Sequence, residues 1–313
     1  MILLIGATLV GQSSCSTSVE ARRSSQTKQK KSSSGPTDIY NKVTTDVPLT
    51  EISASSVVQI NYSTDPGISG AVVQVQAEEK FRDYIEMKVE RGRLEIYLDS
   101  SNGILNNLNA YDPMVRVWVK NGGELKRVTL DGACSFNVTD NYTSSQNLQL
   151  TGSGACSFYF NEIELTGNSQ LMFDLSGACT VLVPGFNGPS LRMAASGACS
   201  VKFDKVVAPK ATIVSSGACD VRMKDLNCQS LTAQADGVAK MWLSGVSNAA
   251  TLTSTGLANL DAAQFKATSL SLNRSGDAKL DYDGDVKMYS PAGSSNSVII
   301  YTPDKEEEEI QQP

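Results

Sequence analysis

Apolar and polar positions alternate along the chain between residues 126 and 282, and each run of alternation follows a glycine. One run, residues 196–203, reads Ser-Gly-Ala-Cys-Ser-Val-Lys-Phe. Counted from the glycine, positions two, four and six are small or apolar, and the positions between them are mostly polar or charged. A period of two predicts a β-strand with one buried face.

The glycines that begin these runs, called the anchor glycines below, recur every 19 to 23 residues. They are Gly132, Gly154, Gly177, Gly197, Gly217, Gly237, Gly256 and Gly276. Each follows a Ser, Thr or Asp, and a small oxygen-bearing residue before a glycine is typical of a tight turn. Self-similarity at this period predicts stacked repeats, in which each copy buries its apolar side with its neighbours.

A second short strand precedes the anchor glycines, as at residues 148–150, 171–173, 191–193 and 270–272. Each repeat therefore consists of a strand, a glycine turn, a second strand and a connector. No apolar pattern with a helical period is long enough to form a helix instead. The sequence predicts an all-β protein, a right-handed parallel β-solenoid (β-helix) with about eight rungs of roughly 20 residues each.

The solenoid is predicted to span residues 126–303, between two segments that lack the repeat. Residues 39–125 contain longer alternating strands, which predict a β-rich section that caps the open end of the solenoid. Residues 100–112 within it form a long polar loop, either functional or disordered. Residues 298–301 are expected to form an imperfect last rung or a C-terminal cap, and residues 304–313 an acidic solvated tail.

The first ten residues are apolar but too few to span a bilayer, and small residues lead from them to Cys15. This pattern predicts a secretory signal, residues 1–15, that ends at a lipid-modified cysteine. The alternative is a terminal fragment of buried strand. Residues 16–38 are polar without hydrophobic pattern and are expected to be a flexible tether. Together they predict an outer-membrane lipoprotein of the cell envelope, held to the membrane by its lipid anchor.

A lipoprotein-like start, an alternating β section and recurring Ser-Gly-Ala phrases together resemble a known family, the "putative auto-transporter adhesin, head GIN domain" family, common in Bacteroidetes. The phrases lie at residues 151–155, 175–178, 195–198 and 215–218, and residues 130–133 carry the variant Leu-Asp-Gly-Ala. The resemblance covers roughly residues 43–301, and family members often have Ser where this chain has Cys. It implies a β-helical envelope protein that is secreted or lipid-anchored, and it brings no catalytic residues.

Composition excludes several classes of function. The chain has a formal charge of −6 and no basic stripe, so a nucleic-acid partner is not expected. It contains no histidine, which excludes Ser-His-Asp and Cys-His catalysis and histidine-based metal sites. Asp261, Asp281, Asp283 and Asp285 cluster near the last rungs, but a solvated turn is the expected reading because a full calcium motif is absent. No catalytic residue, cofactor or metal is predicted.

Five cysteines occupy the same position, two residues after an anchor glycine. They are Cys134, Cys156, Cys179, Cys199 and Cys219. Stacked about 4.8 Å apart on successive rungs, they fit poorly to disulfide geometry and cannot surround a zinc ion tetrahedrally. We expect a buried ladder of small apolar side chains, although an occasional disulfide stays open in an oxidising compartment. Cys228 lies outside the ladder and is the expected reactive thiol.

One outward position, five residues after the glycine, carries two aromatic candidates for ligand contact, Tyr159 and Trp242. The position is occupied by Asn137, Tyr159, Leu182, Lys202, Arg222, Trp242, Asp261 and Asp281. Exposed aromatic rings could stack on sugar rings, or they could cover a neighbouring loop or subunit. Threonine-rich outward rows on the other strand are expected to be structural.

These observations favour a non-enzymatic protein that acts in surface binding or adhesion, with a glycan or a host or cell-surface protein as partner. Two alternatives stay open. One is an enzyme that acts on a polysaccharide with a β-helix as scaffold. The other is a periplasmic structural or envelope-stress component.

Overall fold

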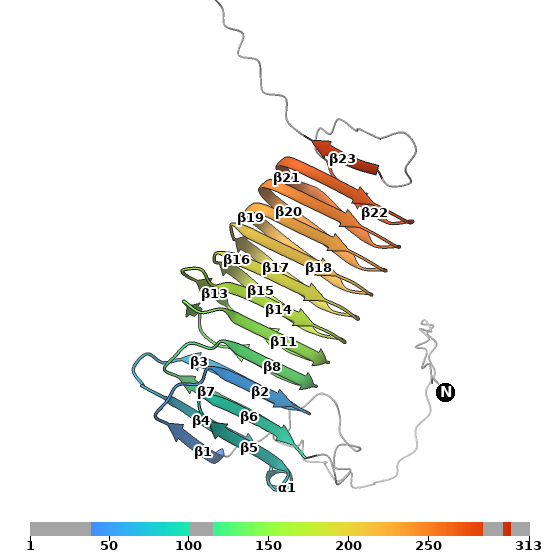
Figure 1. The fold of residues 1–313 in the computed structure, drawn as a ribbon. Helices are drawn as coiled ribbons and strands as arrows, with labels where there is room; N and C mark the ends of the chain where they lie inside the picture. Colours follow the sequence, from blue (N-terminus) through green and yellow to red (C-terminus); the bar gives the residue numbers. More distant parts are fainter. Residues whose placement is uncertain (1–38, 100–114, 284–296, 302–313) are drawn as a thin grey trace, which may run out of the picture. The chain divides into compact units, whose positions relative to one another are not determined.

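The computed structural model describes residues 39–99, 115–283 and 297–301, which lie within one compact unit, residues 35–313 (Figure 1). The described part is almost entirely β-structure with one helical turn, α1 (Glu79–Arg82), and it contains no helix long and apolar enough to cross a membrane. The predicted signal sequence with Cys15, the tether, the loop at residues 100–112, Asp285 and the acidic tail lie outside the described residues.

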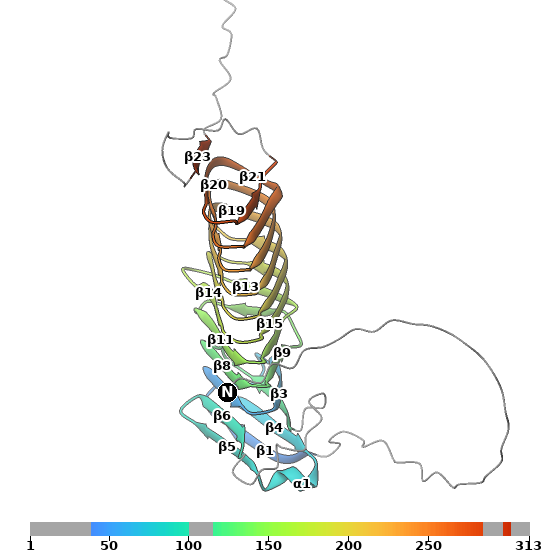
Figure 2. The same ribbon diagram turned by 90° about the vertical axis from the view of Figure 1, so that its right-hand side faces the viewer.

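Parallel strands stack in register along the chain, so the prediction of a parallel β-solenoid with about eight rungs is confirmed (Figures 1 and 2). Strands before each anchor glycine form the pre-glycine stack, and strands after it form the post-glycine stack. The pre-glycine stack contains β8 (Arg127–Gly132), β11 (Leu148–Gly154), β14 (Gln170–Leu175), β16 (Ser190–Ala195), β18 (Lys210–Ser215) and the last residues of β19 (Asp220–Ala235), β20 (Lys240–Ser254) and β21 (Asn259–Arg274). The post-glycine stack contains β9 (Ser135–Val138), β12 (Ser157–Tyr159), β22 (Lys279–Asp281) and the first residues of β15 (Thr180–Asn187), β17 (Ser200–Val207), β19, β20 and β21.

The connectors form a third stack of parallel strands, which the sequence analysis did not predict. This connector stack contains β10 (Tyr142–Ser144), β13 (Glu162–Leu165) and the later parts of β15, β17, β19, β20 and β21. Its inward row includes Ile163, Phe186, Val206 and Leu226, which are register partners on successive rungs and are all buried. Two or three alternating residues per connector are too few to identify a strand from sequence.

The core is a column of apolar side chains from all three stacks. In the post-glycine stack, the position four residues after the glycine runs in register through Phe136, Phe158, Val181, Val201, Val221, Met241 and Leu260. Each of these residues is at most 2% exposed. Full burial of one such side chain stabilises the fold by about 1.5–3 kcal/mol. Because the burial is spread over neighbouring rungs, a single rung cannot form a core by itself.

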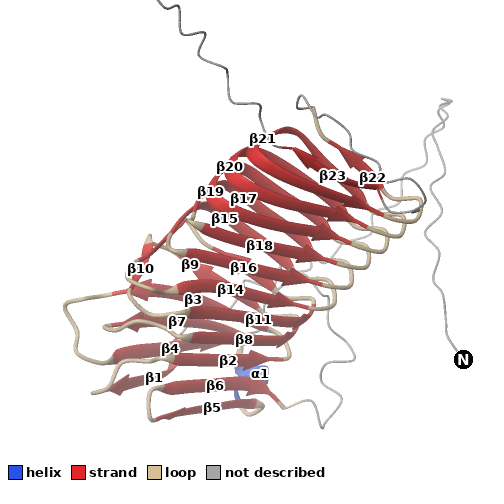
Figure 3. Ribbon diagram, turned by 45° about the horizontal axis from the view of Figure 1, so that its top comes forward, coloured by secondary structure: helices blue, strands red, loops and turns tan. Residues whose placement is uncertain are grey.

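The glycine turns lie one above another along one edge of the solenoid, drawn as tan loops in Figure 3. All eight anchor glycines have positive φ, between 69° and 87°. From Gly154 to Gly256, the backbone N–H after each anchor glycine donates to the previous anchor's carbonyl, as from Ala178 to Gly154 at 2.7 Å. This hydrogen bond brings the turns so close that a Cβ at Gly177 would lie 2.4 Å from the Gly154 oxygen. Glycine is therefore required by both conformation and space.

A further rung precedes the repeats, formed by β2 (Glu51–Ser55) and β3 (Val58–Thr64). Ser56 takes the place of the anchor glycine, with φ 74°, and its carbonyl accepts a hydrogen bond from the Ala133 N–H. This rung lies between β8 and β9 on one side and β6 (Arg93–Leu98) and β7 (Val115–Asn121) on the other. The spatial order of the rungs therefore differs from their order in the chain.

Antiparallel strands close both ends of the described solenoid. At the N-terminal end, β5 (Ile85–Glu90) pairs with β6, β4 (Ala71–Ala77) pairs with β7, and β1 (Ile39–Thr45) pairs with β4. At the other end, β23 (Ser297–Tyr301) pairs antiparallel with β21, so it forms a C-terminal cap strand and not a further parallel rung. Such caps prevent a parallel edge from pairing with another molecule.

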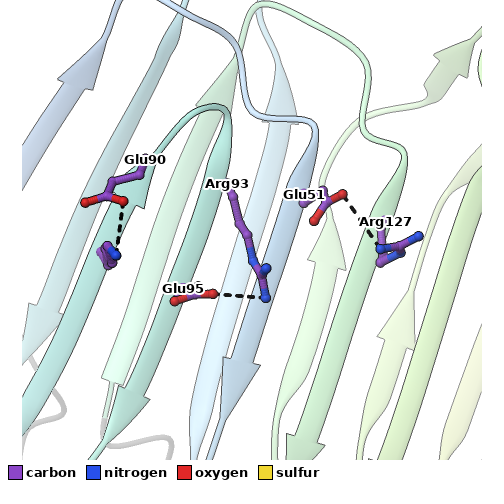
Figure 4. A network of polar contacts seen from close by, with 6 residues as sticks. Glu51, Glu90, Arg93, Glu95 and Arg127 are labelled. Atoms are coloured by element: carbon purple, nitrogen blue, oxygen red, sulfur yellow. Dashed lines mark ion pairs between the residues drawn. The ribbon is translucent and has the colours of Figure 1, made fainter.

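Charges of alternating sign lie along the strands where β2 is placed between β6 and β8 (Figure 4). Glu90, Arg93, Glu51 and Arg127 are register neighbours across β5, β6, β2 and β8. Arg127 and Glu51 form an ion pair at 3.7 Å, and their side chains are 53% and 36% exposed. Exposed pairs contribute little stability, but like charges opposite each other would be unfavourable. The alternation therefore favours β2 between two arginine-bearing strands.

Asn121, the buried last residue of β7, connects the end of this strand to the segment that leads into β2. Its side chain accepts a hydrogen bond from the Leu49 N–H at 2.8 Å and donates to the carbonyls of Leu49 and Gly123, each at 2.9 Å. It also donates to the Tyr62 hydroxyl at 3.1 Å. The side chain is 0% exposed, so these groups have no access to water as a substitute partner.

Replacing an anchor glycine by alanine is expected to destabilise the protein strongly. In Gly177→Ala, the new Cβ meets the Gly154 carbonyl and the residue keeps a left-handed conformation, so we expect a loss of at least about 2 kcal/mol in unfolding free energy. The control is Gly167→Ala, where φ is also positive, 69°, but no atom lies within 4 Å of the new Cβ. Urea denaturation of both variants measures the difference, and equal losses would contradict the role of turn stacking.

Loss of the Asn121 side chain is expected to weaken the N-terminal rungs. Asn121→Ala leaves the Leu49 amide and the Leu49 carbonyl without their side-chain partner in a buried place, which costs about 1–3 kcal/mol. Amide hydrogen exchange at Leu49 should accelerate in the variant. Asn147→Ala is the control, because Asn147 also accepts a backbone N–H, that of Gln170 at 2.8 Å, but does so on the surface. If both variants lost a similar amount of unfolding free energy, burial of Asn121 would not explain its contribution to stability.

Candidate functional site

The outward side of the post-glycine stack, called the outer face below, carries side chains in straight rows. Asn137, Tyr159, Leu182, Lys202, Arg222, Trp242, Asp261 and Asp281 are successive register partners. The prediction that these residues share one outward position is thereby confirmed. The row continues through Asn61 to Trp118 in the N-terminal rungs, which the sequence analysis did not identify.

The two aromatic residues predicted for ligand contact both lie in this row, but far apart. Tyr159 is 40% exposed, and Trp242 is partly exposed between Arg222 and Asp261. Four rung steps of about 4.8 Å separate Tyr159 from Trp242, or roughly 19 Å. A single small molecule cannot touch both rings, so only an extended ligand would contact the two together.

Trp118 is a third exposed aromatic side chain in the same row, at 42% exposure. Its indole N–H donates to Gln76 at 3.2 Å. The sequence analysis missed Trp118 because it lies on β7, outside the repeat, where no anchor glycine sets the register. Only the strand pairing of β7 with β3 reveals that it belongs to the row.

A surface hollow of about 500 Å³ surrounds Trp242 on the outer face. It is lined by Lys202, Phe203, Asp204, Asp220, Arg222, Lys224, Lys240, Met241, Trp242, Asn259 and Asp261. These residues come from four successive rungs, which β17, β19, β20 and β21 supply. The site is therefore built from register alone, with no loop that crosses it in the described part of the chain.

Two of the cations in this hollow are neutralised and two are not. Lys202 pairs with Asp204 at 3.1 Å, and Arg222 pairs with Asp220 at 3.0 Å, a contact that raises the pKa of Arg222 further. Lys224 and Lys240 form no ion pair with another described residue. On the other side of Trp242, Asp261 accepts a hydrogen bond from the Ala263 N–H at 3.1 Å. The indole thus lies between two free cations and one carboxylate.

The aspartates near the last rungs are close in register. Asp261 and Asp281 are direct partners across β21 and β22. Among residues 39–99, 115–283 and 297–301, no group of three or more His, Cys, Asp or Glu side chains is placed to hold a metal ion.

The five cysteines of the repeat are buried free thiols, which confirms the predicted core ladder. Each Sγ lies within 2.9–3.2 Å of the backbone carbonyl three residues earlier and donates to it, as from Cys156 to Ser153. Contact with Cys179 and burial raise the pKa of Cys156 and Cys199, so these two thiols stay protonated. Cys228 is also buried, and burial raises its pKa, which argues against the reactive role predicted for it.

Comparisons with known sequences point to one family. The sequence model of the family described as "Putative auto-transporter adhesin, head GIN domain" matches residues 48–190 and 187–302. No curated protein sequence matches the chain.

Solved structures share the fold at low sequence identity. A "putative adhesin" from Parabacteroides distasonis ATCC 8503 has a TM-score of 0.60 and 13% identity, over 76% of this chain and 93% of that one. A "putative adhesin" from Parabacteroides merdae ATCC 43184 has a TM-score of 0.55 and 11% identity, over the same shares, 76% and 93%. A "putative lipid binding protein" from P. distasonis ATCC 8503 has a TM-score of 0.51 and 17% identity, over 77% and 98%.

The buried thiol at the start of the ladder is expected to make stability depend on alkaline pH. Burial, partly offset by backbone hydrogen bonds, raises the pKa of Cys134 from 9.0 to about 11. The folded state therefore binds this proton more tightly than the unfolded state, and the stability it contributes is present below pH 9 and lost as pH rises to 11. We expect Cys134→Ala and Cys134→Ser to reduce this loss by roughly 2 kcal/mol in denaturation curves between pH 8 and 11. If the unfolding free energy of both variants depended on pH as it does in wild type, the role assigned to the Cys134 thiol would be contradicted.

Proposed function

The chain belongs to the putative auto-transporter adhesin, head GIN domain family, and from this we propose that it is a non-enzymatic binding protein of the cell envelope whose outer face holds the ligand. The family match and structural neighbours named as adhesins support a binding role at the envelope or cell surface. The observation that carries the proposal is the outer face itself. It aligns three exposed or partly exposed aromatic rings and a charged hollow in one straight register.

A glycan or a cell-surface protein is the proposed class of partner. Aromatic rings on a flat β-face offer apolar area at low entropic cost, and flanking polar side chains provide hydrogen bonds. The chain has no histidine, so an activated serine or cysteine nucleophile of the usual kind is not available. A binding role accounts for the outer face without a catalytic step.

Attachment through an acylated Cys15 is part of the proposal. A tether at residues 16–38 would then hold the solenoid away from the membrane and leave its faces accessible. The proposed location is the outer membrane, with the solenoid on the outside of the cell.

Protease treatment of intact cells tests the location. We expect the solenoid to be digested on intact cells, and a periplasmic control protein in the same cells to be protected. Protection until the outer membrane is opened would contradict a surface adhesin and favour a structural role in the periplasm.

If the ligand binds to the outer face, the aromatic residues of that face should contribute to adhesion. Cells with Trp242→Ala or Tyr159→Ala should adhere several-fold less to mucin-coated surfaces, because a ring that packs against a ligand contributes about 1 kcal/mol or more. The matched control is Tyr97→Ala, which removes a 45% exposed ring from β6, a strand that β2 joins to the pre-glycine stack. Equal adhesion by all three variants and wild type would overturn the proposal. Shortening of a polysaccharide by the purified protein would instead establish an enzyme.

A further inference from the structure

We propose that the hollow around Trp242 binds a carboxylated saccharide, with a sugar ring on the indole and its carboxylate held by Lys224 or Lys240. The inference rests on the proposed function, because it specifies the ligand of the outer face. It is argued from the arrangement of side chains around Trp242, from the balance of charge there and from an unsatisfied hydrogen-bond acceptor.

Trp242 lies at the centre of a grid of outward side chains. Lys240 is two residues earlier on the same strand, and Arg222 and Asp261 are its register partners on the neighbouring rungs. Lys224, two residues after Arg222, lies diagonally beyond the indole. All five line the same hollow. An apolar ring is therefore surrounded at short range by groups that recognise charge and hydroxyls.

The charge balance favours an anion next to the indole. Asp204 and Asp220 neutralise Lys202 and Arg222, whereas Lys224 and Lys240 have no ionic partner among the described residues. The chain as a whole has a formal charge of −6, so this free positive charge is a local feature. A carboxylate on the ligand would form the charge-assisted hydrogen bonds that the protein leaves unmade.

The remaining groups of the hollow suit hydroxyls. Asp261 offers a carboxylate acceptor that already receives one hydrogen bond from Ala263. Asn259, the register partner of Lys240, has a side-chain oxygen that is buried and has no hydrogen-bond partner in the described part of the chain. If the Asn259 side chain rotated toward the hollow, its oxygen could accept a hydrogen bond from a sugar hydroxyl. A small carboxylate without a sugar ring would use the lysines but would leave the indole, Asp261 and Asn259 without a partner.

The dimensions agree with one or two sugar rings in the hollow. A volume of about 500 Å³ lies within the range typical of small-ligand sites, about 300–1,000 Å³. The row continues from Arg222 and Lys202 to Leu182 and Tyr159 on successive rungs. A longer acidic polysaccharide can therefore extend along the outer face from the ring held at Trp242.

Oligogalacturonide is a suitable probe, because its methyl ester keeps the sugar chain and removes the negative charge. Calorimetric titration of the full chain uses three ligands: oligogalacturonide, its methyl ester of equal length, and polyglutamate as an acidic polymer without sugar rings. The variants are Trp242→Ala and the double variant Lys224→Gln/Lys240→Gln. The control is Lys210→Gln/Lys266→Gln, which removes the same charge from exposed positions on the other stacks.

We expect oligogalacturonide to bind wild type and the control alike, and to bind Trp242→Ala and the Lys224/Lys240 variant about tenfold more weakly. The methyl ester should lose about as much affinity as the lysine variant does, and polyglutamate should bind no better than the ester. Thermal unfolding should give the same midpoint for all four proteins, which separates loss of contact from loss of fold.

Three results would overturn the inference: no binding of oligogalacturonide, equal binding of its ester, or equal binding of polyglutamate. Adhesion of the Trp242→Ala cells separates this inference from the proposed function. If adhesion falls while oligogalacturonide does not bind, the outer face is a binding site for another ligand. If Trp242→Ala leaves oligogalacturonide binding unaffected and neither Trp242→Ala nor Tyr159→Ala reduces adhesion, the proposed function and the inference fail together.

Discussion

The contact of one glycine turn with the next is the constraint on which the rest of this structure depends. Each anchor glycine has positive φ, and for most of them a Cβ would lie within 3.0 Å of the previous anchor's carbonyl oxygen. From Gly154 to Gly256, the hydrogen bond between the turns fixes each rung on the previous one at the same residue of the repeat. Once the corner is fixed, the alternation of the strand on either side determines which side chains point inward and which point outward.

Inside the solenoid, the same constraint explains the cysteines. The second residue after each glycine points into the narrow corner of the core, where only a small side chain fits. Cysteine fills it in five rungs and alanine in the next three, and each thiol donates to a carbonyl of its own turn. The ladder is thus explained by packing of small side chains in this corner of the core.

On the outside, fixed register converts a repeated sequence into a continuous surface. The outer face is neutral around Asn137, Tyr159 and Leu182, and it becomes charged from Lys202 onward. A conventional pocket needs loops that converge from different places, whereas this site needs only neighbouring rungs. Substitutions at single outward positions can therefore change the ligand while the fold stays the same, which is a useful property for a binding protein.

The sequence by itself determined the repeat, the parallel stacking, the buried cysteine ladder and the row that contains Tyr159 and Trp242. All of these depend on local alternation and on glycines that reset the register every 19 to 23 residues. Only the tertiary structure decided that β2 and β3 lie between β6–β7 and β8–β9, that connectors form a third stack, and that Trp118 joins the outer row. The same is true of the unpaired Lys224 and Lys240 beside Trp242. These features depend on pairing between segments far apart in the chain, and on which side chains then meet across rungs, neither of which a local period encodes.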